Sequence, residues 1–507
     1  MMAEKTRNGG ARVAKDPGHG PTTMDRAMSA RFNCDLAAKP AALPHFWEHT
    51  VGSDHAPMAL RADWRLHLRR AHDELGFRHV RFHGILSDDL GTLLCEENEL
   101  LYSFFNADSA IDFLISIDVR PFVELSFMPT TLASGTTTVF KYRGNVTPPR
   151  DYRQWAALIT KVVGHWVERY GVVEVRRWFF EVWNEPNLNA FWTGSQEDYF
   201  NLYRHTVLAI KAIDKGLRVG GPATAANAWV TEFVDFCRIN ELPADFISTH
   251  HYPTDAFGKP GDDTETQLSE SRRSVLREAA MVAHAQAAGT PLYYTEWSSS
   301  SNPRDPLHDE PYAAAFAVKT VLEANGLVAG YSYWTFSDLF EENYLPSVPF
   351  HGGFGLLNLQ GIAKPAYRAF QLLHRLGSGL MPTAGSHPTV DVWVVTAENL
   401  VTVVCTNWAL PRHPITTEHV RVCLANMVGP AAVTVERIDE HNGNVKKEWQ
   451  NMGEPEYLTK KQVDRLHAAS AVAKRPQRYQ FRNGALTFSL KMPPQGIAVV
   501  SFQTTTR

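Results

Sequence analysis

The sequence predicts an α/β fold in which a (β/α)8 (TIM) barrel is followed by a C-terminal β-sandwich domain. From about Pro44 onwards, short apolar runs alternate with amphipathic helical patterns. Most of these runs are continuously apolar, as in parallel strands that helices cover on the outside. Past Gly377 the pattern changes to strands of alternating polarity. These observations predict a barrel at 45–377 and a sandwich at 378–507.

Eight strand-like runs make up the predicted barrel. They cover residues 45–53, 79–85, 121–127, 178–184, 218–224, 246–252, 292–297 and 331–337. Eight strand–helix units in one stretch of chain are typical of a closed barrel. An open doubly wound sheet is the alternative, but it would usually carry a glycine-rich phosphate-binding turn after an early strand, and no such turn occurs in this sequence.

The helices between the strands are predicted from apolar residues that recur on one face. The first such face is formed by Trp64, Leu68, Ala71 and Leu75. Gly76 follows it and is expected to end the helix. Two late helices, Pro311 to Gly326 and Pro365 to Gly377, begin with proline and end before glycine, which is the usual asymmetry of helix ends.

The C-terminal region has the pattern of a β-sandwich. Residues 389–409 alternate apolar and polar side chains around a turn signal, and 419–427 and 496–503 continue in the same way. Such short alternating strands favour two packed sheets over a further helical layer. One insertion, 457–474, has a helical pattern instead.

Composition and charge indicate an ordinary globular protein. The chain of 507 residues is 44% hydrophobic and 21% charged, with a formal net charge of −4. It has no basic stripe of the kind that binds nucleic acid, and no apolar run approaches the ~20 residues of a membrane span. We therefore expect neither nucleic acid nor a membrane as a partner.

The cysteines and the N-terminus predict a cytoplasmic protein. The cysteines are scattered, without a CxxC pair, at Cys34, Cys95, Cys237, Cys405 and Cys423. Free thiols in a reducing compartment are the expected state. Residues 1–25 lack the apolar core of a secretory signal and are expected to form a disordered tail.

Polar side chains collect at the ends of the otherwise apolar predicted strands. In chain order they are His83, Asn184, Glu185, His250, His251, Tyr252, Glu296, Trp334, Glu341 and Glu342. In a (β/α)8 barrel the C-terminal strand ends form the mouth of the active site. We therefore expect these side chains to meet at one end of the barrel.

Glu185 and Glu296 follow the fourth and seventh strands and form a candidate catalytic pair. Paired carboxylates suit glycoside hydrolysis, in which one protonates the leaving oxygen and the other attacks the anomeric carbon. A separation of ~5–5.5 Å would indicate retention of configuration, and ~6.5–9.5 Å would indicate inversion.

Other interpretations of these residues stay open on pattern alone. A single strand-end glutamate is often a salt-bridged surface residue, and His83 would also fit a core position. His250 and His251 would suit a metal, but no HxH or HExxH spacing supports one, so we expect no metal and no cofactor. Aromatic residues near the strand ends would stack on a sugar ring or fill the core, namely Trp183, Trp192, Tyr252, Trp297, Trp334 and Phe350.

Several short stretches, taken together in this order, resemble glycoside hydrolase family 39. They are RFHGIL, PPRDYRQW, WNEPNLNAFW, STHHYP, TEWSSS and FEENYLPSVPFHGGFGLL. The resemblance extends from about Phe32 to the C-terminus and includes the helical insertion. This family holds bacterial β-xylosidases and the related animal α-L-iduronidases. Glu341 and Glu342 resemble the xylosidase branch, because two negative charges there would repel a uronic acid.

The resemblance implies roles for individual residues. Glu185 would be the acid/base and Glu296 the nucleophile, while Asn184 would bind the sugar 2-hydroxyl. The sugar at the non-reducing end would be bound by His83, His250, Tyr252, Trp334, Glu341 and Glu342. The N-terminal segment, 26–44, would pack on the sandwich and add a strand to it through 31–37.

The implied chemistry makes demands on both glutamates. Glu185 must be protonated near neutral pH, and apolar surroundings such as Trp183 together with the charge of Glu296 would raise its pKa. Glu296 must stay ionised, and Arg81 is a candidate partner for it.

The expected function is that of a retaining, exo-acting β-xylosidase. It would release xylose from xylobiose and short xylo-oligosaccharides in xylan degradation, by a two-step double displacement. The alternatives are β-glucosidase or α-L-arabinosidase activity of the same family, or a non-catalytic carbohydrate-binding protein. The presence of both glutamates and of Asn184 argues against the last alternative.

Overall fold

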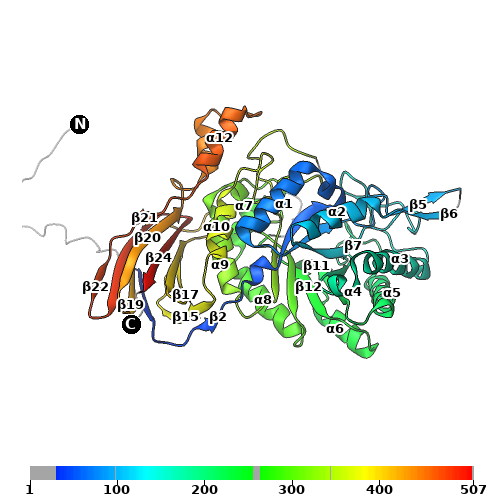
Figure 1. Ribbon diagram of the computed structural model, residues 1–507, viewed down its shortest axis with the longest axis horizontal. Helices are drawn as coiled ribbons and strands as arrows, with labels where there is room; N and C mark the ends of the chain where they lie inside the picture. Colours follow the sequence, from blue (N-terminus) through cyan, green and yellow to red (C-terminus); the bar gives the residue numbers. More distant parts are fainter. Residues whose placement is uncertain (1–29, 98, 255–262, 343, 505–507) are drawn as a thin grey trace, which may run out of the picture.

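A barrel and a pair of stacked β-sheets make up the molecule (Figure 1). The computed structural model describes residues 30–504 except 98, 255–262 and 343, so the expected tail at 1–25 lies outside the described residues. Within these residues the predicted (β/α)8 barrel and C-terminal sandwich are both confirmed.

Eight parallel strands close the barrel. In chain order they are β3 (Thr50–His55), β4 (His79–His83), β7 (Arg120–Leu125), β10 (Phe179–Val182), β11 (Arg218–Thr224), β12 (Phe246–His250), β13 (Leu292–Trp297) and β14 (Gly330–Tyr333). The last strand pairs with the first, Tyr333 opposite Val51, and this pairing completes the ring. The C-terminal ends of all eight strands therefore meet at one end of the barrel.

The first barrel strand begins later than the predicted run at 45–53. Residues Phe46–Glu48 form a 3-10 helix (η1), and the strand starts only at Thr50. The apolar side chains that suggested a strand, Phe46 and Trp47, are buried because this helical turn packs against β14. A short apolar run does not by itself distinguish a strand from a buried helical turn.

Helices connect the strands and cover the outside of the barrel (Figure 1). They are α1 (Ala62–Leu75), α2 (Phe105–Ser116), α3 (Tyr152–Tyr170), α4 (Val172–Val175), α5 (Gln196–Ile213), α6 (Val230–Ile239), α7 (Thr264–Glu270), α8 (Val275–Gln286), α9 (Pro311–Glu323) and α10 (Pro365–His374). Helix α1 ends at Gly76, whose φ of 77° is left-handed. Ser195 and Asp198 form a capping box at the start of α5.

Two β-hairpins are inserted between barrel strands and helices. The hairpin β5 (Leu93–Glu96) with β6 (Glu99–Tyr102) follows β4, and β8 (Thr138–Val139) with β9 (Gly144–Asn145) follows β7. The second hairpin is tied to the loop after β14, because the Lys141 amide donates to the Glu342 carbonyl oxygen at 2.7 Å. It therefore lies at the C-terminal end of the barrel.

The sandwich consists of a seven-stranded and a five-stranded sheet. The first has the order β2 (Ala41–Ala42), β15 (Gly379–Met381), β17 (Val390–Ala397), β18 (Leu400–Asn407), β24 (Gly496–Thr504), β20 (Pro430–Ile438), β21 (Arg475–Pro476). The second has the order β16 (Thr383–Ala384), β1 (Ala30–Asp35), β19 (Glu418–Ala425), β23 (Ala485–Met492), β22 (Gln480–Arg482). The N-terminal segment thus contributes β1 to one sheet and β2 to the other.

The seven-stranded sheet is covered on both faces. On one face Val394, Val403 and Val500 pack into the core between the two sheets. On the other face Val395, Val404 and Val499 belong to the core of the barrel, where α9 contacts β18 and β24. Because successive strand residues point to opposite sides, this sheet joins the two units into one body.

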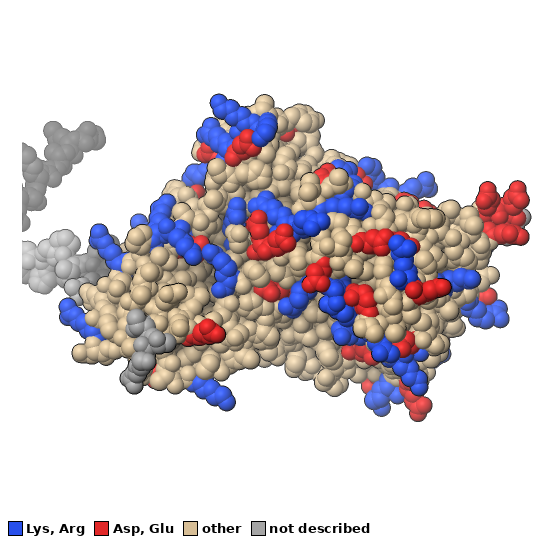
Figure 2. Space-filling model, in the orientation of Figure 1, with Lys and Arg blue, Asp and Glu red and all other residues tan. Residues whose placement is uncertain are grey.

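The remaining described elements lie on the outside. The helix predicted within 457–474 is present as α12 (Lys460–Ala469), and α11 (Val445–Asn451) precedes the predicted insertion. Lysines, arginines and acidic residues are interspersed on the barrel face shown in Figure 2. Among the described residues, no helix combines the length and apolarity that a membrane crossing requires.

Candidate active site

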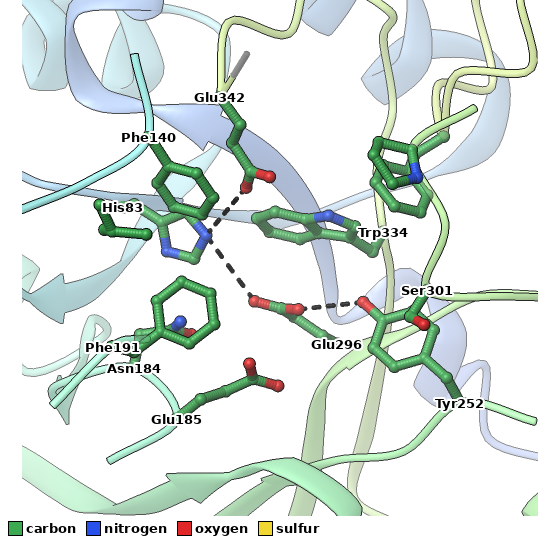
Figure 3. A pocket seen from close by; sticks show the side chains of 13 residues that line it. His83, Phe140, Asn184, Glu185, Phe191, Tyr252, Glu296, Ser301, Trp334 and Glu342 are labelled. Atoms are coloured by element: carbon green, nitrogen blue, oxygen red, sulfur yellow. Dashed lines mark hydrogen bonds and ion pairs between the residues drawn. The ribbon is translucent and has the colours of Figure 1, made fainter. Parts of the chain in front are cut away.

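A cavity of about 400 Å³ lies at the C-terminal ends of the barrel strands (Figure 3). Seven of the predicted site residues line it, namely His83, Asn184, Glu185, Tyr252, Glu296, Trp334 and Glu342. Six further residues complete the lining, namely Val139, Phe140, Phe191, Ser301, Pro303 and Phe354. The strand-end polar groups therefore do meet, as their positions in the sequence predicted.

Backbone irregularities aim the two glutamates into the cavity. In a regular strand, neighbouring side chains point to opposite faces. At the end of β10, Trp183 and Glu185 have positive φ values of 72° and 44°, an unusual conformation for residues with side chains. On β13 the register shifts between Tyr294 and Trp297, so that both Thr295 and Glu296 face the barrel interior.

Arg81 is the centre of a buried ionic network below the cavity. Its guanidinium lies 2.6 Å from Glu181, 2.8 Å from Glu124, 2.7 Å from Glu296 and 2.9 Å from the Asn184 side-chain oxygen. A planar guanidinium has five N–H donors and can bond several oxygens at once. One cation from β4 thus fixes side chains from β7, β10 and β13.

Glu296 is surrounded by hydrogen-bond donors. Arg81 bonds Oε1 at 2.7 Å, and the Tyr252 hydroxyl donates to Oε2 at 2.9 Å (Figure 3). His83 Nε2 lies 3.9 Å from the same carboxylate. Hydrogen bonds and cations stabilise a carboxylate relative to its acid, as a nucleophile requires. Arg81 is the partner that the sequence suggested for it.

Glu185 has the opposite environment. It is only 5% exposed, and burial together with the negative charge of Glu296 raises its pKa well above the ordinary value. The strongest contact of its carboxyl group is with His250, whose Nδ1 lies 2.9 Å from Oε1. One oxygen of Glu185 lies within 4.8 Å of one oxygen of Glu296. The pair therefore joins a carboxyl group of raised pKa, Glu185, to a carboxyl group that Arg81 and Tyr252 hold by hydrogen bonds, Glu296.

His83 and Glu342 form a second polar group on the far side of Glu296. His83 Nδ1 bonds Glu124 at 2.7 Å, and its Nε2 lies 3.6 Å from Glu342. Despite its burial, the neighbouring carboxylates raise the pKa of His83 to about 10. Burial raises the pKa of Glu342 to about 7. Both side chains can therefore hydrogen-bond to a hydroxyl group of a ligand, His83 as a donor and Glu342 as a donor or an acceptor.

Two of the predicted sugar-binding residues do not line the cavity. His250 is fully buried behind the cavity, where it contacts Glu185 and Thr295. Glu341 lies outside: its amide bonds the buried Asp54, and its carboxylate interacts with Arg61. Successive residues after β14 point in different directions, so only Glu342 reaches the site.

The aromatic residues divide in the same way. Trp334 and Tyr252 line the cavity, as predicted. Of the two interpretations left open for Trp183, Trp192 and Trp297, the structure supports the core, because all three are buried there and none lines the cavity. Phe350 packs on Trp449 of α11. A large aromatic side chain near a strand end turns outwards as readily as inwards, because rings dominate core packing.

Sequence reasoning missed the apolar part of the lining. Val139 and Phe140 come from the hairpin β8–β9, and Phe191 and Phe354 come from loops. The only available signal was that Phe191 and Phe354 fall inside the family-like stretches WNEPNLNAFW and FHGGFGLL. Phe140 carries no such signal, because its position depends on the fold of an inserted hairpin.

Glu185, His250 and Glu296 also offer three potential ligand atoms within 4.8 Å of one another. His250 Nδ1 and Glu185 Oε1 are 2.9 Å apart, which is a hydrogen-bonding distance. Ligands of a tetrahedral zinc ion with bonds of ~2.1 Å stand about 3.4 Å apart. A shared proton fits this contact better than an ion does. At the other end of the barrel, His45 and His374 both bond Glu48 Oε1, at 2.6 and 2.8 Å.

Known proteins resemble this chain along most of its length. A β-xylosidase of Caldicellulosiruptor saccharolyticus is 46% identical over 95% of this chain and 100% of its own. A β-xylosidase of Geobacillus stearothermophilus is 35% identical over 90% of this chain and 92% of its own. The crystal structure of a monomeric β-xylosidase from Caulobacter crescentus CB15 superposes with a TM-score of 0.84, at 33% identity, over 94% of this chain and 100% of the other.

The family model for glycosyl hydrolases of family 39 matches residues 31–487. This match spans the barrel and nearly all of the sandwich, and it includes both cavity glutamates. Together with the opposed environments of Glu185 and Glu296, it shows that this chain is a glycoside hydrolase and belongs to glycosyl hydrolases family 39.

Proposed function

We propose that this protein is a β-xylosidase that removes xylose from the non-reducing end of short xylo-oligosaccharides with retention of configuration. The observation that carries the proposal is the close pair of Glu185 and Glu296, whose oxygens lie within 4.8 Å, with a raised pKa at Glu185 and Arg81 bonded to Glu296. A carboxyl separation of ~5–5.5 Å is that of retaining enzymes, in which one group attacks directly. The two full-length curated relatives are both β-xylosidases, and they support the choice of sugar.

The first step forms a glycosyl-enzyme. A Glu296 carboxylate oxygen bonds the anomeric carbon while the bond to the leaving oxygen breaks, and Glu185 gives that oxygen its proton. Asn184 accepts from Arg81 through its side-chain oxygen, so its amide N–H groups remain available for the sugar 2-hydroxyl.

The second step releases xylose. Once Glu296 is esterified, it no longer has a negative charge. The pKa of Glu185 then falls, because that charge was one of the causes that raised it. Glu185, now a carboxylate, takes a proton from water while the water oxygen bonds the anomeric carbon and Glu296 leaves. The same side chain thus serves as acid and then as base.

The lining favours a neutral sugar over a uronic acid. Among the described residues that line the cavity, none is lysine or arginine, the cationic His83 is already paired with Glu124, and Glu342 is acidic. Val139, Phe140 and Phe191 add apolar surface next to the polar groups. A pentose ring without a charged substituent suits this combination.

Hydrolysis of 4-nitrophenyl β-D-xylopyranoside tests the activity, with the β-glucoside and the α-L-arabinofuranoside as competitors. Discrimination against glucose rests on the room for one hydroxymethyl group, which is worth only ~1–3 kcal/mol. We expect the xyloside to have the highest kcat/KM, and a preference for either competitor would overturn the choice of xylose. Proton NMR should show β-xylose as the first anomer released, whereas initial α-xylose would contradict retention.

We further propose that the enzyme works in the cytoplasm on xylobiose and short oligosaccharides. All five cysteines are free thiols, and Cys95 is exposed. Free thiols persist in reducing compartments. Fractionation of cells that make the protein should recover xylosidase activity with cytoplasmic markers, and activity in the medium would contradict this location.

A further inference from the structure

A chain of hydrogen bonds runs from a buried carboxylate to Glu185. Thr295 Oγ1 lies 2.8 Å from Glu181 Oε1 and 3.1 Å from His250 Nε2. His250 Nδ1 in turn lies 2.9 Å from Glu185 Oε1. Glu181 and His250 are fully buried, and Thr295 is nearly so. No part of the proposed reaction so far uses Glu181, Thr295 or His250.

The direction of each hydrogen bond follows from the ionisation of Glu181. Burial raises the pKa of Glu181, but Arg81 opposes this effect, because its Nε lies 2.6 Å from Glu181 Oε2, the distance of a charge-assisted pair. We therefore take Glu181 as a carboxylate, which can only accept. A threonine hydroxyl has a single proton, and Thr295 donates it to Glu181. The Thr295 oxygen must then accept from His250, which places a proton on Nε2.

The proton between His250 and Glu185 must consequently belong to Glu185. Burial and the nearby cations Arg81 and His83 lower the pKa of His250 well below its ordinary value, so the ring is neutral. A neutral imidazole with its proton on Nε2 has a bare Nδ1. At 2.9 Å this nitrogen accepts from a protonated Glu185 and would repel an ionised one.

We infer that Thr295 and Glu181 are positioning residues that hold His250 in its Nε2–H tautomer, and that His250 thereby keeps Glu185 protonated as the general acid of the resting enzyme. The kinetic consequence rests on the proposed function, because it requires Glu185 to act as the acid. In this arrangement His250 serves the acid/base and does not bind sugar.

Other titratable groups also face Glu185, and they must be kept constant in any test. They are Tyr252 beyond the end of β12, Glu296 on β13, Arg81 and His83 on β4, and Glu342 in the loop after β14. The Thr295 side chain does not bond any of these groups. Removing the Thr295 hydroxyl group therefore releases His250 from its Nε2–H tautomer and leaves the titratable groups around Glu185 in place.

The test compares Thr295→Val, Thr295→Ser and Thr249→Val on xylobiose, whose leaving group needs protonation. Valine has the shape of threonine without the hydroxyl, so His250 is free to place its proton on Nδ1 and stabilise ionised Glu185. The pKa of Glu185 then falls, and the alkaline limb of the kcat/KM profile should move down by about one pH unit, the equivalent of one hydrogen bond to a charged group.

Two controls separate this effect from a general loss of packing. Thr295→Ser retains the hydroxyl and should keep the wild-type alkaline limb. Thr249→Val removes a hydroxyl of equal burial on β12 that donates to the Thr224 carbonyl at 2.9 Å, and it should also keep that limb. An unshifted limb in Thr295→Val, or an equal shift in Thr249→Val, overturns the inference.

Neutron diffraction from deuterated wild-type crystals tests the tautomer without any assay. Deuterium is expected on His250 Nε2 and on Glu185, and deuterium on His250 Nδ1 overturns the inference. This readout stays decisive if Thr295→Val fails to fold. It is also independent of the proposed function, which fails instead if the folded wild-type enzyme cleaves no xyloside.

Discussion

The two ends of the barrel interior are built from the same strands but contain opposite chemistry. At the N-terminal end, the rings of Phe122, Phe179, Phe246 and Tyr293 pack on one another with centroid distances of 5.0–6.1 Å. Two residues further along the same strands stand Glu124, Glu181, Ser248 and Thr295. One step of the strand period thus separates an aromatic layer from an ionic one.

Histidines on one strand show what this difference does. His79 and His83 both lie on β4, one in each layer, and His79 is half-buried whereas His83 is buried. Burial lowers the pKa of His79 to about 4, whereas the Glu124 carboxylate raises the pKa of His83 to about 10 despite its burial. Burial alone therefore does not set the protonation of a histidine in this barrel, because neighbouring carboxylates can reverse its effect on the pKa. The aromatic layer should serve stability and the ionic layer chemistry, and the following substitutions test that division.

Glu296→Ala should have the largest effect on activity. Without the proposed nucleophile the proposed covalent intermediate should not form, and we expect kcat on an aryl xyloside to fall roughly 10⁵-fold or more. The substitution also removes one carboxylate from a crowded acidic cluster, so the melting temperature should not fall with it. Added azide should attack from the vacated face and give the α-xylosyl azide, and formation of the β-azide would contradict the assignment.

Glu185→Ala should cost less, and its cost should depend on the leaving group. Loss of general acid–base help is worth about 10²–10⁴-fold, so kcat on xylobiose should fall by that factor. An activated aryl xyloside needs little protonation, so its first step should survive and give a burst of phenol. Azide should restore turnover and yield the β-xylosyl azide. Full activity on xylobiose would remove Glu185 from the acid/base role.

Prediction from sequence worked where the strand period determines the outcome. His83, Glu185 and Glu296 stand at strand ends, and parallel strands in one barrel bring such ends together whatever the loops do. The alternation of side chains along a strand did not predict their directions at two places, because backbone irregularities at Trp183 and Thr295 turn the neighbouring side chains.

The rest of the site depends on long-range packing that no local pattern encodes. Phe140 lines the cavity from an inserted hairpin, whose Lys141 amide bonds the Glu342 carbonyl oxygen. His250 faces Glu185 instead of the sugar because Thr295 and Glu181 lie behind it. Neither the position of Phe140 in the cavity nor the contact of His250 with Glu185 could be predicted from the type of the residue or from its place in a motif.

Phe179→Ala should separate stability from chemistry. It removes one ring from the aromatic layer, and we expect a loss of about 3–5 kcal/mol in the free energy of unfolding. Glu181, two residues along β10, retains its bond to Arg81, so kcat/KM of the folded enzyme should stay close to wild type. Chemical denaturation and steady-state kinetics on the same preparations measure both quantities. A large fall in kcat/KM would mean that the two layers are not independent.

Glu342→Gln, with Glu341→Gln as its matched control, gives the smallest expected change and locates the edge of the ionic layer. Glu342 lines the cavity 3.6 Å from His83, whereas Glu341 is turned towards Arg61 outside it. Because the pKa of Glu342 is about 7, the wild-type side chain is mostly a neutral carboxylic acid at pH 6 and resembles glutamine there. At pH 8 it is ionised and can form a charge-assisted hydrogen bond to a sugar hydroxyl, worth ~1.5–3 kcal/mol.

The ratio of wild-type to Glu342→Gln kcat/KM should therefore rise from near one at pH 6 to roughly tenfold to hundredfold at pH 8. The negative charge of Glu342 also helps to raise the pKa of Glu185, so its loss moves the alkaline limb of the variant downwards and changes the ratio in the same direction. Glu341→Gln should follow the wild-type profile throughout. Equal profiles for the two variants would show that Glu342 does not touch the sugar and that the ionic layer ends at His83.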